Sequence, residues 1–403
     1  MSFVRIGSFP VVGARIQPTE LIFLFMLATS ARVFGGRLIQ SGTRRMWVAG
    51  GLYVGANLLS AGLATHPTSL LEAAGRGYLL LLLFLVALYV ANRSREGIAD
   101  LADKYLVGTM VLTAIAYVGY FVAVSGTFNS LVQVYGKYPY LGTVIRAKGL
   151  TSGAGMLVVV LIFPVLYAYR EWRTGRRSVT AFAFLLPLAL LTFSKEVVLI
   201  SFGLLLVEPR LRRVPKVLRL LATAAVAVFF WAATHFILQT RQDFASSSLA
   251  GTQYTSGEVL LVTNHFQVIE TSYTALKVAG VRVFFANPWF GVGPGNFIGE
   301  LPALAAAGDY PEHLPLYDPH MTWLGALSET GLFGFGTLLI FCVLLFVEIR
   351  PILNDEQPAV PALFASLLLI LILSMSKDVA NFRFVWIMVA LLLGLTWRKK
   401  LAV

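Results

Sequence analysis

The feature that most constrains this chain is a series of apolar stretches, each about 20 residues long, separated by short polar breaks. Continuous runs such as Tyr78 to Val90 and Met156 to Tyr169 are typical of helices that cross a lipid bilayer. A β-barrel would instead show segments of about ten residues with alternating polarity. The sequence therefore predicts an all-α polytopic membrane protein.

The composition supports this class of protein. Hydrophobic residues make up 57% of the chain, charged residues make up 13%, and the mean hydropathy is +0.76. The single cysteine, Cys342, lies in an apolar run, which argues against a disulfide framework and a thiol metal site. The outer face does not have enough histidines, cysteines or carboxylates at convergent spacing for a zinc site. We therefore expect no metal and no cofactor.

Basic residues outnumber acidic ones and give a net charge of +12. They gather in the short breaks between apolar stretches, which is the positive-inside pattern of membrane proteins and not a nucleic-acid-binding patch. The clusters are Arg37/Arg44/Arg45, Arg93/Arg95/Lys104, Arg170/Arg173/Arg176/Arg177, Arg210/Arg212/Arg213/Lys216/Arg219 and Arg398/Lys399/Lys400.

If these clusters face the cytoplasm, about eleven spans place all of them on one side, and a short segment within residues 1–17 would make about twelve. One integrated membrane domain results, with an N-terminal bundle (1–238), a large outer loop (239–319) and C-terminal helices (320–403). The predicted spans are 18–36, 46–64, 74–92, 105–125, 151–169, 179–193, 196–208, 217–238, 320–347, 358–375 and 379–397.

The segment 239–319 is the long outer break of this topology. Its roughly eighty residues, rich in Ser, Thr, Asn, Gly and Pro, exceed what a connection between two helices needs. Within it, Val259 to Phe285 has helical apolar spacing, which predicts one or two amphipathic helices over the bundle. We therefore interpret the segment as a functional loop.

Several basic residues fall on the outer face, where topology alone predicts few. Arg76 begins one predicted span, Arg146 precedes another, and Lys195 lies in the break Ser194-Lys195-Glu196. Ionisable groups at membrane depth are costly and mark functional sites. Together, these cations predict an anionic ligand, and a lipid-linked phosphate or diphosphate fits best.

Each of these residues also has a structural interpretation. Arg146 can extend to the lipid headgroups, and Arg76 can anchor at the same level. Lys195 and Glu196 can form an internal ion pair, and the adjacent residues Lys377-Asp378 are expected to form another.

His320 is the strongest single candidate for chemistry. It follows Asp318-Pro319, where proline favours a helix start, and it precedes an apolar run. We expect its imidazole at the outer membrane boundary, where an ordinary pKa of about 6.5 lets it accept a proton at neutral pH. The alternative is a helix-terminal histidine that is satisfied by a backbone group.

Upstream of His320, the string Gly291-Val-Gly-Pro-Gly-Asn superficially resembles a phosphate-binding loop. It lacks both the preceding strand and the following Lys-Ser/Thr that a nucleotide loop requires. Gly291, Gly293 and Gly295, with Asn296, are instead interpreted as a tight turn that lets segments pack closely beside the candidate active site.

These motifs together resemble the O-antigen ligase and polymerase superfamily. The resemblance rests on Arg146 and its following glycines, the Ser194-Lys195 break, the Pro-x-x-Gly-Val-Gly-x-Gly-Asn-Phe string at 288–297, and His320 followed by Glu329-Thr-Gly-Leu-x-Gly. It implies a membrane glycosyltransferase of the GT-C type in the bacterial inner membrane. Such an enzyme moves a glycan from an undecaprenyl-diphosphate carrier to an acceptor on the periplasmic face, and in the ligase the acceptor is lipid A-core.

The resemblance also implies residue roles. His320 matches the histidine proposed as the base that deprotonates the acceptor hydroxyl, and Arg146 matches an arginine that holds the diphosphate. Lys195 stands where many members have arginine, which keeps the charge but loses the bidentate fork. Family members usually have another arginine before the Gly-Val-Gly turn, where this chain has Glu270-Thr-Ser-Tyr. The candidates to replace it are Arg282 and Arg241, and Arg76 completes the expected diphosphate-binding set.

Such a reaction is chemically coherent without a metal ion, because the diphosphate is already a good leaving group. Fixed cations would hold it, and one base would remove the proton of the attacking hydroxyl. In-line attack predicts inversion at the anomeric carbon, and activity is expected to persist in EDTA.

Three classes of function compete at this point. The first is an O-antigen ligase, and the second is a repeat-unit polymerase or a protein O-oligosaccharyltransferase with the same donor. The third is a transporter of anionic lipids, which is disfavoured because no internal repeat and no matched pair of interrupted helices is apparent. The dominant outer loop favours the ligase.

Overall fold

The protein is mostly helical. The computed structural model describes residues 9–11, 14–16, 43–64, 68–92, 95–138, 142–208, 214–240, 255–353, 355 and 357–401. Its α-helices are α2 (Arg44–Leu63), α3 (Thr68–Ala91), α4 (Arg95–Val124), α5 (Ala154–Arg173), α6 (Thr180–Leu190), α7 (Val197–Val207), α8 (Lys216–His235), α10 (Ser272–Ala286), α11 (Phe297–Ala306), α12 (Thr322–Ile349), α13 (Ala359–Leu373) and α14 (Arg383–Leu401). The strands are β1 (Phe9–Val11), β2 (Ala14–Ile16), β3 (Val132–Tyr138), β4 (Gly142–Ala147), β5 (Phe236–Thr240), β6 (Thr255–Val262) and β7 (Phe266–Thr271).

Among the described residues, 5 helices are long and apolar enough to cross a membrane, which supports a polytopic membrane protein. They lie at 44–63, 69–91, 99–124, 154–173 and 322–352. The predicted spans 179–193 and 196–208 correspond to α6 and α7, which have 11 residues each. At about 1.5 Å per residue, neither helix reaches across a hydrocarbon core of about 30 Å. The predicted segments 1–17 and 18–36 lie largely outside the described residues.

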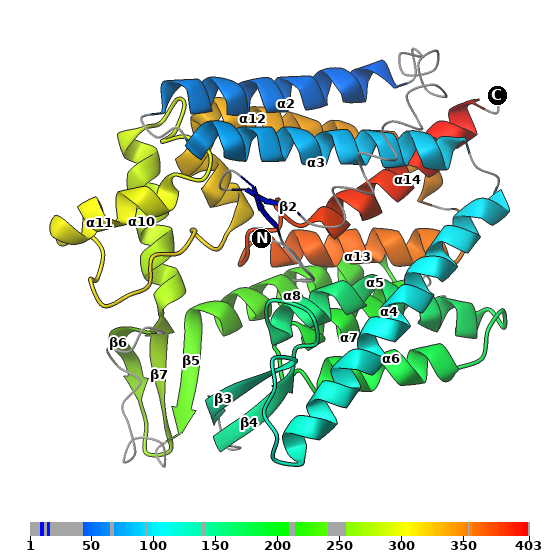
Figure 1. Ribbon diagram of the computed structural model, residues 1–403, viewed down its shortest axis with the longest axis horizontal. Coiled ribbons are helices and arrows are strands. Elements are labelled where there is room, and N and C mark those ends of the chain that lie inside the picture. Colours follow the sequence, from blue (N-terminus) through cyan, green and yellow to red (C-terminus); the bar gives the residue numbers. More distant parts are fainter. Residues whose placement is uncertain are drawn as a thin grey trace.

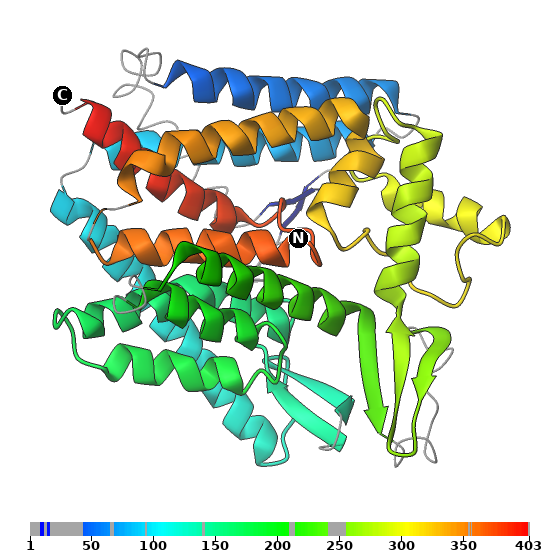
Figure 2. The same cartoon turned by 180° about the vertical axis from the view of Figure 1, so that it is seen from behind.

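The helices form two groups that pack side by side (Figures 1 and 2). In one group, α2, α3, α12 and α14 share a core that includes Met46, Leu83, Phe341 and Trp397. In the other, α5 lies among α4, α6, α7 and α13, and almost its whole circumference is buried. A helix that is apolar on all sides is expected to occupy the middle of a bundle, which is where α5 lies.

Short β-sheets complete the fold, so the expected all-α architecture applies to the bundle and not to its connections. Strands β3 and β4 form an antiparallel hairpin in which Gln133 pairs with Arg146. Strands β5, β7 and β6 form a three-stranded antiparallel sheet in the order β5-β7-β6, in which Phe236 pairs with Glu270. Both sheets lie toward the end of the bundle that carries α10 and α11 (Figure 2).

The segment 259–285, predicted as amphipathic helix, is divided between two structures. Its first part forms β6 and β7, and only the remainder forms α10. The β7 sequence FQVIET is rich in β-branched residues (Val268, Ile269 and Thr271), and the burial of its last residues alternates along the strand. This period of two explains why a strand forms where apolar spacing alone predicted a helix.

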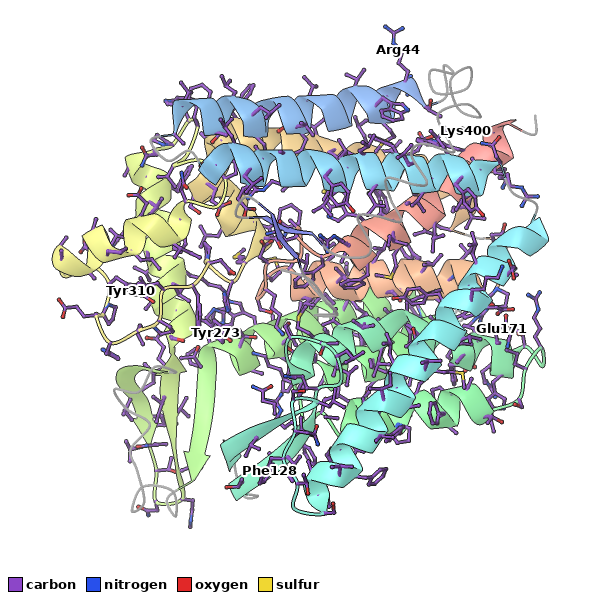
Figure 3. The ribbon with its side chains drawn as sticks, viewed as in Figure 1. Arg44, Phe128, Glu171, Tyr273, Tyr310 and Lys400 are labelled. Atoms are coloured by element: carbon purple, nitrogen blue, oxygen red, sulfur yellow. The ribbon has the colours of Figure 1, made fainter. Side chains whose placement is uncertain are left out.

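Figure 3 shows labelled residues at both ends of the bundle. Arg44 and Lys400 lie at one end, and Tyr310 lies toward the other. Helices α10 and α11 and the segment that follows them have a small core of their own, formed by Leu276, Ala279, Val283, Phe297, Leu301, Tyr310 and Leu314. This core supports the segment that carries His320.

Candidate functional site

His320 lies just before α12 in a conformation that non-glycine residues rarely adopt, with φ of 49°. Its neighbour Asp318 stabilises this turn with a single carboxylate oxygen. Oδ1 accepts a hydrogen bond from the His320 backbone N–H at 2.7 Å and lies 2.6 Å from the ring nitrogen Nδ1. Unusual backbone conformations of this kind cluster at functional sites.

The contact with Asp318 assigns the tautomer of the imidazole. A carboxylate only accepts hydrogen bonds, so Nδ1 carries the proton and Nε2 is the nitrogen with a free lone pair. Burial opposes ionisation of Asp318, but its contacts with His320 prevail and lower the pKa of this carboxyl. The pair therefore has the arrangement of a base that is oriented by an adjacent carboxylate.

Tyr273, at the start of α10, connects His320 to Lys195. The imidazole packs at a tilt of 33° against the Tyr273 ring with 4.8 Å between ring centres, and Lys195 Nζ lies 5.7 Å from the centre of the same ring. Lys195 also donates a hydrogen bond of 2.8 Å to Thr234 Oγ1 near the end of α8. The structure thus brings together a possible base and a cation that lie more than a hundred residues apart in the sequence.

Further cations surround Lys195. Arg146, on β4, donates from Nε to the carbonyl oxygen of Thr192 at 2.7 Å, in the break between α6 and α7 that also carries Lys195. Lys277 on α10 and Lys377 in the break between α13 and α14 add positive charge from the other side.

Burial lowers the pKa of Lys195 to about 8; Glu196 opposes this shift, whereas the charges of Lys377, Lys277 and Arg146 add to it. Burial also lowers the pKa of Lys277 to about 8. A buried lysine whose pKa is lowered further by neighbouring cations is the electrostatic signature expected of an anion-binding site.

The carboxylate Glu196 does not form an ion pair with Lys195, which was one of the two interpretations left open for this break. It pairs with Lys377 at 2.6 Å and accepts a hydrogen bond from Ser194. The expected pairing of Lys377 with Asp378 is also wrong, because Asp378 instead accepts hydrogen bonds from Asn381, Thr322 and the Ala380 backbone. Adjacent residues at these helix breaks point in different directions, so proximity in the sequence does not predict the ion pairs.

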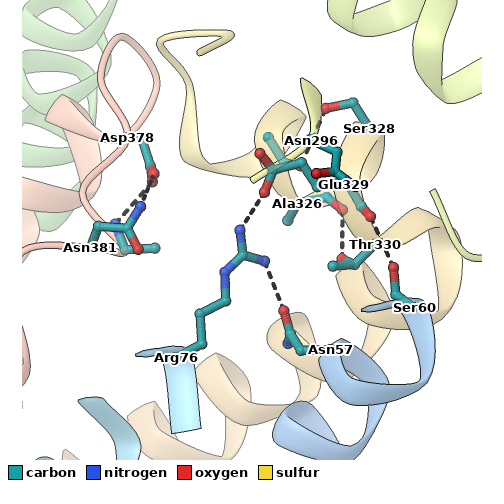
Figure 4. A network of polar contacts seen from close by, with 12 residues as sticks. Asn57, Ser60, Arg76, Asn296, Ala326, Ser328, Glu329, Thr330, Asp378 and Asn381 are labelled. Carbon is teal, nitrogen blue, oxygen red and sulfur yellow. Dashed lines mark hydrogen bonds and ion pairs between the residues drawn. The ribbon is translucent and has the colours of Figure 1, made fainter. Parts of the chain in front are cut away.

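Arg76, which the sequence interpretation included in the diphosphate-binding set, has a carboxylate partner in the structure. It forms an ion pair with Glu329 on α12 and donates from Nη1 to Asn57 Oδ1 on α2 at 2.7 Å (Figure 4). The side chains of Arg76 and Glu329 are 11% and 10% exposed. Arg76 therefore joins three helices, and its charge is already neutralised.

The glycine turn at 291–295 packs against a break in α12. At Gly331 the helix adopts φ of 63° and ψ of −168°, and the Gly293 N–H donates to the carbonyl oxygen of Glu329 at 2.8 Å. Ser60 on α2 donates to the carbonyl oxygens of both Phe290 and Glu329. The turn is thus a close-packing element, as its glycines predicted, and Asn296 stabilises it with a hydrogen bond to the carbonyl oxygen of Val292 at 2.9 Å.

We expect Gly291→Ala to destabilise the protein by more than about 2 kcal/mol, because φ is 65° there and a Cβ would lie 2.3 Å from the backbone of Glu329. Gly308→Ala is the matched control, since φ is 78° but nothing lies within 4 Å of its Cβ position. The control is expected to cost only about 1 kcal/mol. Equal unfolding midpoints for the two variants in detergent would contradict the close-packing interpretation.

The remaining candidates from the sequence are Arg282 and Arg241. Arg282 forms an ion pair with Asp309 at the partly exposed edge of α10. Arg241 lies outside the described residues. A small cavity of about 20 Å³, large enough for about one water molecule, lies between Asp318, Asp378 and the Arg76–Glu329 pair.

Asp318, Tyr273 and Lys277 belong to the site although the sequence interpretation gave them no role. One signal for the latter two was available: they are four residues apart on α10 and therefore share a helix face. Asp318 also precedes His320 by two residues, a spacing at which an aspartate often bonds the backbone of its own turn.

The fold and the site define a polytopic membrane protein with cations and an oriented histidine gathered at one end of its helices. Residues 189–339 match the family model described as O-antigen ligase, which confirms the resemblance to that superfamily. The match includes Lys195, the glycine turn and His320, whereas Arg146 precedes it. It supports a membrane glycosyltransferase-like function of the ligase or polymerase type. No curated protein matches the chain.

Proposed function

We propose that this protein is an O-antigen ligase that transfers a glycan from undecaprenyl diphosphate to lipid A-core on the periplasmic face of the bacterial inner membrane. The observation that carries the proposal is the placement of His320 and Lys195 on the same ring, Tyr273. The reaction needs a base for the acceptor and a cation for the leaving group, and these two residues supply them around one aromatic ring.

His320 acts as the base in this scheme. The acceptor hydroxyl oxygen attacks the anomeric carbon as its proton passes to Nε2, and the bond from that carbon to the diphosphate oxygen breaks. The diphosphate leaves with the electron pair of that bond. Asp318 keeps Nδ1 protonated and stabilises the imidazolium that forms.

Lys195 and Arg146 hold the diphosphate and stabilise the charge that it gains on leaving. Attack from the side opposite the leaving group inverts the anomeric configuration. The scheme includes no metal ion, so EDTA is expected to leave the rate unchanged. The membrane lipids around the helices would hold the apolar chain of the donor beside the site.

The test is transfer of glycan from an undecaprenyl-diphosphate donor to purified rough lipopolysaccharide by the purified protein. A glycan ladder on the lipopolysaccharide supports the ligase. Extension of the donor glycan without transfer would make the protein a polymerase, and transfer to a protein acceptor would make it a protein O-oligosaccharyltransferase. The absence of all three products would overturn a glycosyltransferase function.

The affinity for the donor is expected to fall as the pH rises from 7 to 9. Lys195, with its pKa of about 8, is mostly charged at pH 7 and mostly neutral at pH 9. The diphosphate diester of the donor keeps its charge in this range, so its KM should rise roughly tenfold. Lys195→Arg should reduce this slope, because arginine stays protonated. A KM that is independent of pH in the wild-type protein would exclude Lys195 from donor binding.

A further inference from the structure

We propose that Lys277 on α10 is a further diphosphate-binding residue, which acts together with Lys195 at the end of α8. This inference rests on the proposed function, because it concerns the same site and the same leaving group. It begins from a contact in the structure: Lys277 reaches the end of α8, where Lys195 is also held.

Lys277 and Lys195 are anchored on adjacent residues. Lys195 Nζ donates to Thr234 Oγ1 at 2.8 Å, and Lys277 Nζ lies 2.7 Å from His235 Nε2. Thr234 and His235 are the last two residues of α8, so both lysines contact the same end of this helix.

The hydrogen bonds of His235 identify Lys277 as the donor of this contact. His235 Nδ1 lies 2.7 Å from the carbonyl oxygen of Trp231, and a carbonyl only accepts, so Nδ1 carries the ring proton. Nε2 then accepts from the ammonium group of Lys277. Lys277 also donates to the carbonyl oxygen of Met375 at 3.2 Å, which ties α10 to the break between α13 and α14 that carries Lys377.

Lys195 and Lys277 differ from Lys377 in their partners. In the part of the chain that the structure describes, neither Lys195 nor Lys277 forms a salt bridge with a carboxylate, and Glu196 pairs with Lys377. Both lysines are only partly exposed, so their charges are incompletely solvated. A dianionic diphosphate would compensate them, and its two phosphate groups suit two adjacent ammonium groups.

The position of Lys277 on α10 also directs it toward the proposed active site. Tyr273, which contacts both His320 and Lys195, lies one helical turn before Lys277 on the same face of α10. Arg282 lies further along the helix and is paired with Asp309, so of the two described cations on α10, Lys277 is the one directed at the site.

The experiment measures binding of inorganic pyrophosphate and of a short prenyl diphosphate to the full-length protein in detergent at pH 7. Lys277→Ala is expected to weaken both roughly tenfold, the loss of about one charge-assisted hydrogen bond, whereas Lys277→Arg should retain most of the affinity. Lys104→Ala is the matched control, because Lys104 is exposed and pairs with Asp100 elsewhere on the protein. Unchanged affinity in folded Lys277→Ala would overturn the proposal.

A second measurement uses the wild-type protein and so does not depend on the folding of a variant. Amine acylation mapped by mass spectrometry should be slowed at Lys277 and Lys195 by pyrophosphate, and unchanged at Lys104. Equal labelling of Lys277 with and without pyrophosphate would overturn the inference even if transfer activity is present. Conversely, Lys277-dependent binding in a protein that transfers no glycan would refute the proposed function and leave the diphosphate site standing.

Discussion

His320→Ala is expected to lower the rate of glycan transfer by about a hundredfold or more, because general base catalysis contributes about 10² to 10⁴. The affinity for the diphosphate should remain close to wild type, since the cations that hold the donor are unchanged. The measurement is kcat and KM in the transfer assay with lipopolysaccharide as acceptor. A variant that folds and keeps more than about a tenth of the wild-type kcat would remove His320 from the role of base.

Asp318→Asn tests the same hypothesis from the neighbouring side chain. An amide can accept a hydrogen bond from Nδ1–H, but it does not stabilise an imidazolium as a carboxylate does. We expect a lower kcat, a shift of the acidic limb of the pH–rate profile, and partial rescue by Asp318→Glu. A uniform loss of activity at all pH values would mean that Asp318 only stabilises the turn through the His320 backbone N–H.

Arg76→Ala is expected to destabilise the protein by about 3–5 kcal/mol, because it leaves Glu329 as an unpaired carboxylate in a buried site. The hydrogen bond to Asn57 is lost as well. Thermal unfolding in detergent measures this effect, and pyrophosphate binding to the folded fraction should be unchanged. A stable variant with weakened pyrophosphate binding would restore Arg76 to the diphosphate-binding set.

The double variant Arg76→Met/Glu329→Met is the control for this prediction. It removes both charges and keeps apolar volume between α2, α3 and α12, so it should recover most of the stability lost in the single variant. If the double variant were as unstable as Arg76→Ala, the loss would come from packing or from Asn57 and not from the unpaired charge.

The helical character of this protein was predictable from its sequence, because apolar runs near the thickness of a bilayer leave the backbone few alternatives. The prediction of about eleven full spans was less accurate. Helices α6 and α7 have 11 residues each, and the polar break that carries Lys195 separates them. Hydropathy detects apolar composition, but the length of a helix depends on where its backbone breaks.

The sequence also indicated the segment around His320 as the candidate site. The proline before it, the apolar run after it and the glycine turn upstream pointed to this segment, and the match over residues 189–339 supports the resemblance to the superfamily. These signals are local in the chain, since each depends on a few consecutive residues whose types restrict the backbone directly.

Only the tertiary structure decided which charges act together. From the sequence, Arg76 and Lys195 were both predicted to bind the diphosphate, and Lys377 was expected to pair with Asp378. In the fold, Arg76 pairs with Glu329 and Lys377 pairs with Glu196. Lys195 and Lys277 lie at the end of α8 and have no carboxylate partner within the described residues. Electrostatic partnership depends on distance and burial across helices remote in the chain, and these arise only when the helices pack.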